Sequence, residues 1–148
     1  MRYFLDAEYN GFGGALISLA LVPEDAALAP FYAAVACPDP TPWVAEHVLP
    51  ILAAMPVERA QMADRFADYL TDDPDPLLVA DWPEDIAHAA RLLVVGPGRM
   101  KPIRSLRFEL VDPALFAPAP NAMPHNALSD ARALRAAVLA HEARAARF

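Results

Sequence analysis

Three short apolar segments joined by turn residues open the chain, and they constrain its fold more than any other feature. Residues 1–8 read MRYFLDAE, residues 15–22 read ALISLALV and residues 31–36 read FYAAVA. Short apolar runs bounded by Gly, Pro, Asn and Asp predict β-strands, and the short connections between them predict an antiparallel meander. The consecutive apolar residues Tyr3, Phe4 and Leu5 in the first segment predict a central strand that is buried on both faces.

The remaining segments alternate between helical and strand patterns. Met62, Phe66 and Leu70 recur at four-residue spacing and predict a helix over residues 57–70. Further helices are expected over residues 43–49, 83–93 and 127–146, strands over 77–80 and 106–111, and loops over 96–102 and 113–124. This order predicts an α/β fold with a mixed central sheet, a three-strand antiparallel meander plus parallel strands, flanked by α-helices. The 148 residues contain no long linker, so we expect a single domain over residues 1–148.

Composition excludes several classes of protein. The net charge of -7 argues against a protein that grips nucleic acid through a broad basic surface, although an acidic site can still meet a polyanion through bound cations. No apolar run reaches the roughly 18 residues of a membrane span, and Asp6 interrupts the segment where a signal peptide needs apolar residues. Cys37, the single cysteine, cannot form an internal disulfide. We therefore expect a cytoplasmic protein without a membrane partner.

Two acids end the first predicted strand. Asp6 and Glu8 are two residues apart, so their side chains project from the same face. Two carboxylates side by side on a buried strand repel each other and lose hydration unless a cation binds them. The alternative is that the strand ends in solvent at residue 6.

The start of the last predicted helix holds a second unusual acid. Asp130 shares a helix face with the apolar residues Ala133 and Leu134, which places a carboxylate on the inward stripe. It either lines a cleft or is a first-turn acid that the helix dipole stabilises. His125 lies in the loop just before this helix, close to Asp130, and is either functional or an exposed bystander.

The segment DWPED at residues 81–85 contributes two further acids. Asp81 ends a predicted strand, and with Pro83 and Glu84 after it the spacing predicts that Asp81 is the N-cap of the next helix. Asp85 shares a helix face with apolar residues and is the better candidate for a site, although the helix dipole also favours an acid there.

Together these three acidic segments resemble the motifs of the DEDDh 3'–5' exonucleases, which have the ribonuclease H-like fold. The matching stretches are LDAE at 5–8, DWPED at 81–85 and HNALSDA at 125–131, and the resemblance spans nearly the whole chain. It is closest to the small bacterial 3'–5' exoribonuclease-like branch. Asp81 stands in place of the usual Asn and Glu84 in place of the usual aromatic residue, so either Asp81 or Asp85 could be the ligand from the second motif. We favour Asp85.

The resemblance implies a specific chemistry. Asp6, Glu8, Asp85 and Asp130 would hold two divalent metal ions, Mg²⁺ or Mn²⁺, and His125 would be the general base that takes the proton of the attacking water. The reaction would be hydrolysis of phosphodiester bonds from the 3' end of single-stranded nucleic acid, RNA in preference to DNA, with release of nucleoside 5'-monophosphates. The family also implies a homodimer.

Two other interpretations remain open on the sequence. The chain could be a non-catalytic nucleic-acid or nucleotide-binding module on the same fold, although the presence of every motif acid and of His125 speaks against it. A basic cluster follows the third helix, and it either contacts a phosphate backbone or belongs to a solvated loop. Its members are Arg99, Lys101, Arg104 and Arg107.

Overall fold

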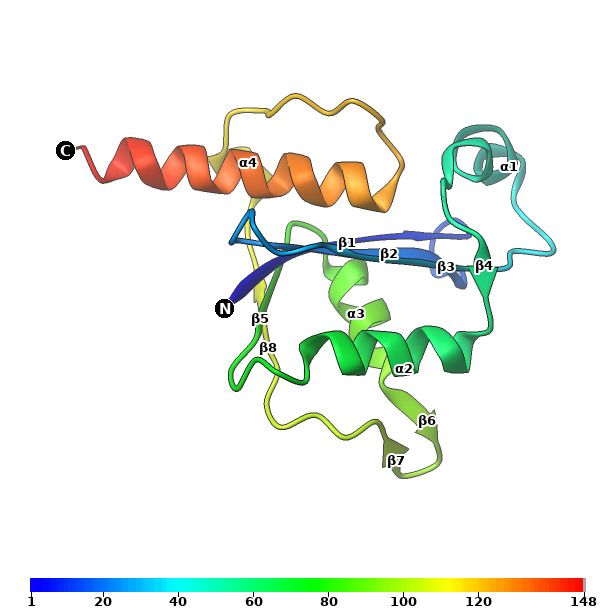
Figure 1. Cartoon of the computed structure of the whole chain (residues 1–148). Coiled ribbons are helices and arrows are strands. Elements are labelled where there is room, and N and C mark those ends of the chain that lie inside the picture. The colour runs from blue at the N-terminus through cyan, green and yellow to red at the C-terminus, as the bar shows by residue number, and fades with distance from the viewer. Residues whose placement is uncertain (148) are drawn as a thin grey trace.

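A six-stranded mixed sheet is the centre of the computed structural model, which describes residues 1–147 (Figure 1). Its strands are β1 (Arg2–Tyr9), β2 (Leu16–Pro23), β3 (Phe31–Val35), β4 (Pro56–Val57), β5 (Leu77–Ala80) and β8 (Arg107–Leu110). Their spatial order is β4-β3-β2-β1-β5-β8. The first three strands are antiparallel, whereas β4, β5 and β8 each pair in parallel with a neighbour. The predicted α/β class and mixed sheet are confirmed, and the ribonuclease H-like identity stays a prediction.

Helices cover both faces of this sheet. The α-helices are α1 (Pro42–His47), α2 (Arg59–Leu70), α3 (Pro83–Leu92) and α4 (Ala127–Ala145), and short 3₁₀ helices are η1 (Leu49–Ile51) and η2 (Pro113–Leu115). Helix α4 lies along one face, and α2 and α3 lie on the other (Figure 1). No helix within residues 1–147 is both long and apolar enough to cross a membrane.

Strand β1 is the buried central strand that the sequence predicts. Leu5 and Ala7 point into the core beneath α2 and α3, whereas Phe4 packs in the core beneath α4. Because side chains alternate along a strand, Asp6 and Glu8 share the face of Phe4 and project towards α4. The burial of the strand therefore decides which side of the sheet receives the two acids.

Two segments differ from the sequence prediction. The predicted helix over residues 57–70 begins only at Arg59, because Pro56 and Val57 pair with the edge of β3 as β4. The predicted loop over residues 96–102 contains a small hairpin of β6 (Val94–Gly96) and β7 (Arg99–Met100). Both differences are strand pairings with partners that short-range periodicity does not reveal.

Candidate metal centre

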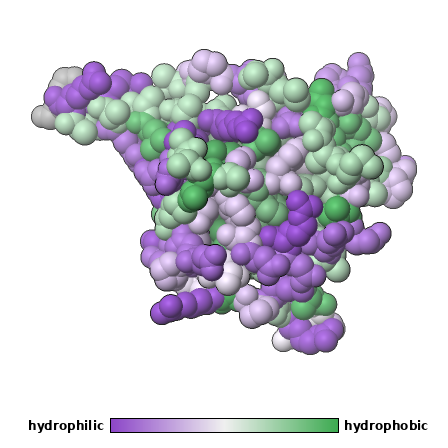
Figure 2. Space-filling view, in the orientation of Figure 1, coloured by the Kyte–Doolittle hydropathy of each residue, from purple (hydrophilic) through white to green (hydrophobic). Residues whose placement is uncertain are grey.

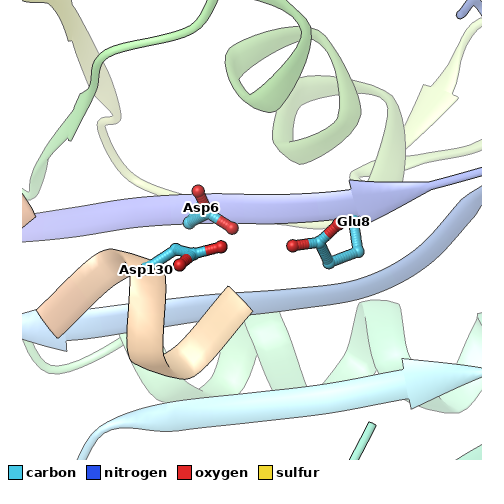
Figure 3. Close-up of side chains that lie close together, drawn as sticks. All are labelled: Asp6, Glu8 and Asp130. Carbon is cyan, nitrogen blue, oxygen red and sulfur yellow. The ribbon is translucent and has the colours of Figure 1, made fainter. Parts of the chain in front are cut away.

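Asp6, Glu8 and Asp130 meet between the central strand and the last helix (Figure 3). Asp6 and Glu8 extend from β1, Asp130 extends from the first turn of α4, and the three carboxylates point towards one another. A carboxylate oxygen of each lies within 4.8 Å of the other two. The start of α4 is set by Asn126, whose side chain accepts the Ser129 N–H as N-cap. The cap thus determines where Asp130 stands relative to β1.

A second group of acids shares Asp6. Carboxylate oxygens of Asp6, Asp81 and Asp85 also lie within 4.8 Å of one another. Parallel pairing aligns Phe4 of β1 with Val79 of β5, so two residues further on Asp81 comes level with Asp6. Asp85 arrives from the first turn of α3, which follows β5 directly. Four of the five other acids in the three motifs therefore gather around Asp6, and Glu84 is the exception.

Both candidates for the second-motif ligand lie beside Asp6, but they differ in environment. Asp81 lines a cleft of about 350 Å³ together with Asp6 and Asp130. Asp85 is only 3% exposed and forms a hydrogen bond with the backbone of Ala7. Both carboxylates lie within reach of a cation that Asp6 would also bind.

The prediction that Asp81 is the N-cap of the third helix is wrong. The N-cap of α3 is Trp82, which makes no side-chain cap hydrogen bond, and Pro83 occupies the first helical position. The helix begins one residue later than the capping pattern suggests. Asp81 is therefore free of the structural role that explained it on the sequence.

Burial and the charges of neighbouring carboxylates raise the pKa values of Asp6, Glu8, Asp81 and Asp85. The pKa of Asp6 lies well above its ordinary value, chiefly because of burial and then because of the charges of Asp85 and Asp130. Burial and, to a lesser degree, the charge of Asp130 raise the pKa of Glu8 to about 8. Burial and the neighbouring Asp81 raise the pKa of Asp85. A bound cation would reverse each of these effects.

One oxygen of the cluster lacks any partner. Asp6 Oδ2 is occluded from solvent and has no hydrogen-bond donor within the described part of the chain. A buried carboxylate oxygen without a donor costs stability unless a cation contacts it. Together with the all-carboxylate donor set, which suits hard divalent ions such as Mg²⁺ and Mn²⁺, this orphaned oxygen fits a metal site.

Hydrogen bonds from the loop before α4 hold Asp130 in place. Asn121 Nδ2 donates to Asp130 Oδ1, and the backbone N–H of His125 donates to Asp130 Oδ2 at 3.0 Å. Ser129 Oγ in turn donates to Asn121 Oδ1 at 2.7 Å. These contacts orient the carboxylate towards the cleft that Asn121 also lines. Sequence reasoning missed Asn121, which lies in a Pro-rich loop without a recognisable pattern.

His125 is tied to Asp130 through its backbone, and its side chain turns to an aromatic neighbour. The residue is exposed and has a φ of 68°, a left-handed conformation that is uncommon outside glycine. Its ring meets the Trp43 ring edge-on, with centroids 4.9 Å apart and planes at 80°. Among residues 1–147, no hydrogen bond involves its ring nitrogens. The backbone of His125 is thus anchored to Asp130, whereas its imidazole lies against Trp43 and outside both groups of acids.

An aromatic pocket of about 330 Å³ adjoins Glu8, and sequence reasoning missed it. Its aromatic lining residues are Tyr9, Phe12, Trp43 and Trp82. The side chains of Phe12 and of both Trp residues are exposed, that of Phe12 by 99%. Glu84 ties the pocket together by accepting hydrogen bonds from Tyr9 Oη and Trp82 Nε1, both at 3.2 Å. A signal was present in the sequence, because a Phe in a Gly-rich turn and two Trp residues near acidic motifs are unusual on a surface.

Part of the basic cluster is neutralised within the protein. Lys101 pairs with Asp64, and Arg107 pairs with Asp75 at 2.6 Å. The β6–β7 hairpin also lies on the opposite side of the sheet from α4 (Figure 1). These observations favour the solvated-loop interpretation over a nucleic-acid contact beside the acidic cleft.

The chain was compared with protein-family models and with curated proteins, and neither comparison found a match.

Proposed function

We propose that this protein is a metal-dependent 3'–5' exonuclease of the DEDDh type, acting on RNA in preference to DNA. The observation that carries the proposal is the convergence of Glu8, Asp81, Asp85 and Asp130 around Asp6, from β1, from the start of α3 and the residues just before it, and from the start of α4. Segments more than 120 residues apart in the chain supply these acids, so local helix capping or strand fraying does not account for their meeting.

The donor set supports a site for two divalent ions. Asp6 would be the shared ligand, with Glu8 and Asp130 on one side and Asp85 or Asp81 on the other. Bound there, divalent ions would supply Lewis-acid stabilisation of the scissile phosphate and of the departing oxygen. They would also compensate the repulsion that raises the pKa values of Asp6 and Glu8. The negative net charge is compatible with a polyanionic substrate on this basis.

His125 is proposed to accept the proton of the attacking water. An imidazole is the side-chain group that most often serves as a general base at neutral pH. The hydrogen bond from its backbone to Asp130 keeps the residue beside the acids. Its exposed position leaves the imidazole accessible to water.

The aromatic pocket supports a single-stranded nucleic acid as the substrate. Exposed aromatic rings stack on unpaired bases, and each such contact contributes about 1–3 kcal/mol. Phe12, Trp43 and Trp82 provide such rings directly beside Glu8. Figure 2 shows hydrophobic residues at the end of the molecule where Figure 1 places α1, the helix that carries Trp43.

The test is cleavage of single-stranded RNA and DNA labelled at the 5' end, incubated with Mn²⁺, Mg²⁺ or EDTA. We expect a ladder that shortens from the 3' end and nucleoside 5'-monophosphate products. EDTA should abolish the ladder, and so should the Asp6→Ala substitution. Asp68→Asn, which removes an exposed acid of α2 outside the cluster, should leave the rate unchanged.

The rival binding module makes a different prediction in the same assay. A module would retain RNA in a gel-shift experiment, yet no ion would give a ladder at any enzyme concentration. Cleavage that is independent of divalent ions, or that Asp6→Ala leaves intact, would contradict the proposed metal centre.

A further inference from the structure

A second cavity lies on the α2/α3 side of the sheet, away from α4. Its volume is about 420 Å³, and it opens between the start of α2, the middle of α3 and the ends of β2 and β3. Its walls are largely small or apolar, and its charged and titratable lining groups are Glu58, Arg59, His88 and Arg91. The acids of the candidate metal centre are absent from this lining.

Two of these lining groups are arginines without carboxylate partners. No ion pair within residues 1–147 involves Arg59 or Arg91, although the protein carries 19 acids against 12 basic residues. The guanidinium of Arg59 donates to the backbone oxygen of Arg91 at 2.7 Å, which holds it next to the second arginine and leaves further N–H groups for a ligand. Two guanidinium charges against the single carboxylate of Glu58 therefore leave an excess of positive charge along the cavity.

The start of α2 adds to this positive end. The N-cap residue Glu58 makes no side-chain cap hydrogen bond, so the first backbone N–H groups of this 12-residue helix have no side-chain acceptor. Such uncapped N–H groups and the helix dipole favour an anion.

His88 is an independent sign of a ligand. It is only 8% exposed and lines the cavity, yet no hydrogen bond within the described residues involves its ring nitrogens. One face of the ring stacks on Tyr9, with centroids 4.8 Å apart. Neither ring nitrogen is among the fully occluded unpaired atoms of residues 1–147, so the imidazole can be reached from the cavity and can form a hydrogen bond with a ligand there.

The geometry points to a binding site for a phosphate monoester with a compact apolar or planar body, such as a nucleoside 5'-monophosphate. Arg59, Arg91 and the α2 N-terminus would hold the phosphate oxygens, because guanidinium groups bind such oxygens through paired hydrogen bonds. His88 would donate a further hydrogen bond. The apolar wall formed by Leu16 and Val35 would cover the body of the ligand. This inference is independent of the proposed nuclease activity.

The test is NMR titration of the ¹⁵N-labelled full-length protein in EDTA, so that no divalent ion draws phosphate to the acidic cleft. The probes are adenosine 5'-monophosphate, inorganic phosphate, adenosine and adenylyl-adenosine, which carries only a phosphodiester. We expect adenosine 5'-monophosphate to bind most tightly, with shifts at the first turn of α2 and at His88. Phosphate should bind more weakly, and adenosine and adenylyl-adenosine more weakly still.

Matched substitutions separate this site from general electrostatic attraction. Arg59→Gln and Arg91→Gln should each weaken adenosine 5'-monophosphate binding roughly tenfold. Arg65→Gln removes an exposed charge from the same helix, outside the cavity, and should leave the affinity unchanged. Equal binding of adenosine or adenylyl-adenosine, equal loss in all three variants, or the absence of shifts at α2 and His88 would overturn the inference.

Discussion

Glu8→Gln should stabilise the metal-free protein at pH 8 and have little effect at pH 5. The reason is that burial and Asp130 raise the pKa of Glu8 from 4.5 to about 8 in the folded state. Between these two values the folded protein binds a proton that the unfolded chain has lost, so the free energy of unfolding falls as the pH rises. Gln carries no charge, so the variant does not lose this part of its free energy of unfolding as the pH rises.

The size of the expected stabilisation follows from the interval between the two pKa values of Glu8, 4.5 in the unfolded chain and about 8 in the folded protein. Each pH unit between the two pKa values corresponds to about 1.4 kcal/mol, which gives an upper bound of about 4–5 kcal/mol at pH 8. Glu8 is partly exposed, and solvent screening reduces this by roughly half, to about 2 kcal/mol. In a chain of this length that corresponds to a rise in Tm of about 4–8 °C. At pH 5 the two proteins should differ by less than about 1 kcal/mol.

The assay is urea denaturation in EDTA at pH 5 and pH 8, with Glu46→Gln on the exposed surface of α1 as the matched control. Addition of Mn²⁺ at pH 8 should raise the stability of the wild type more than that of Glu8→Gln, because the cation compensates the same charge. A Glu8→Gln variant that is equally or less stable than the wild type at pH 8 would refute the reasoning. So would a stabilisation of the same size at pH 5.

Four further outcomes test individual side chains. Asp85→Asn should weaken Mn²⁺ binding in calorimetric titrations more than Asp81→Asn does, and the reverse order would assign the second motif to Asp81. His125→Ala should retain Mn²⁺ binding and slow RNA cleavage by about 10²–10⁴-fold, so unchanged turnover would remove His125 from the reaction. Trp43→Ala should weaken the binding of single-stranded RNA by about 1–3 kcal/mol, with Trp43→Phe recovering most of the affinity in fluorescence titrations. Asn126→Ala should lower the free energy of unfolding by about 2–3 kcal/mol, because it removes the α4 cap and leaves the Ile51 carbonyl without its donor.

Much of the fold follows from local patterns in the sequence. The apolar start of β1 predicts a strand buried on both faces, and the Met62-Phe66-Leu70 stripe predicts α2, because burial of an apolar face dominates the choice of secondary structure. The same patterns failed where pairing with a distant segment determined the secondary structure. β4 forms because Pro56 and Val57 pair with β3, a contact that residues near them in the chain do not encode.

The candidate site was likewise predictable in part from the sequence and in part only from the tertiary structure. The sequence by itself determined which acids are out of place, since a carboxylate on a buried strand or on an inward helix face is unfavourable whatever surrounds it. Only the tertiary structure decided that Asp6 faces Asp130 on one side and Asp81 and Asp85 on the other. Parallel pairing of β1 with β5 and the packing of α4 against β1 set those distances, and both are contacts between residues more than 70 positions apart. Local physical chemistry thus identifies the charges that need a partner, whereas the partners themselves are set by long-range packing.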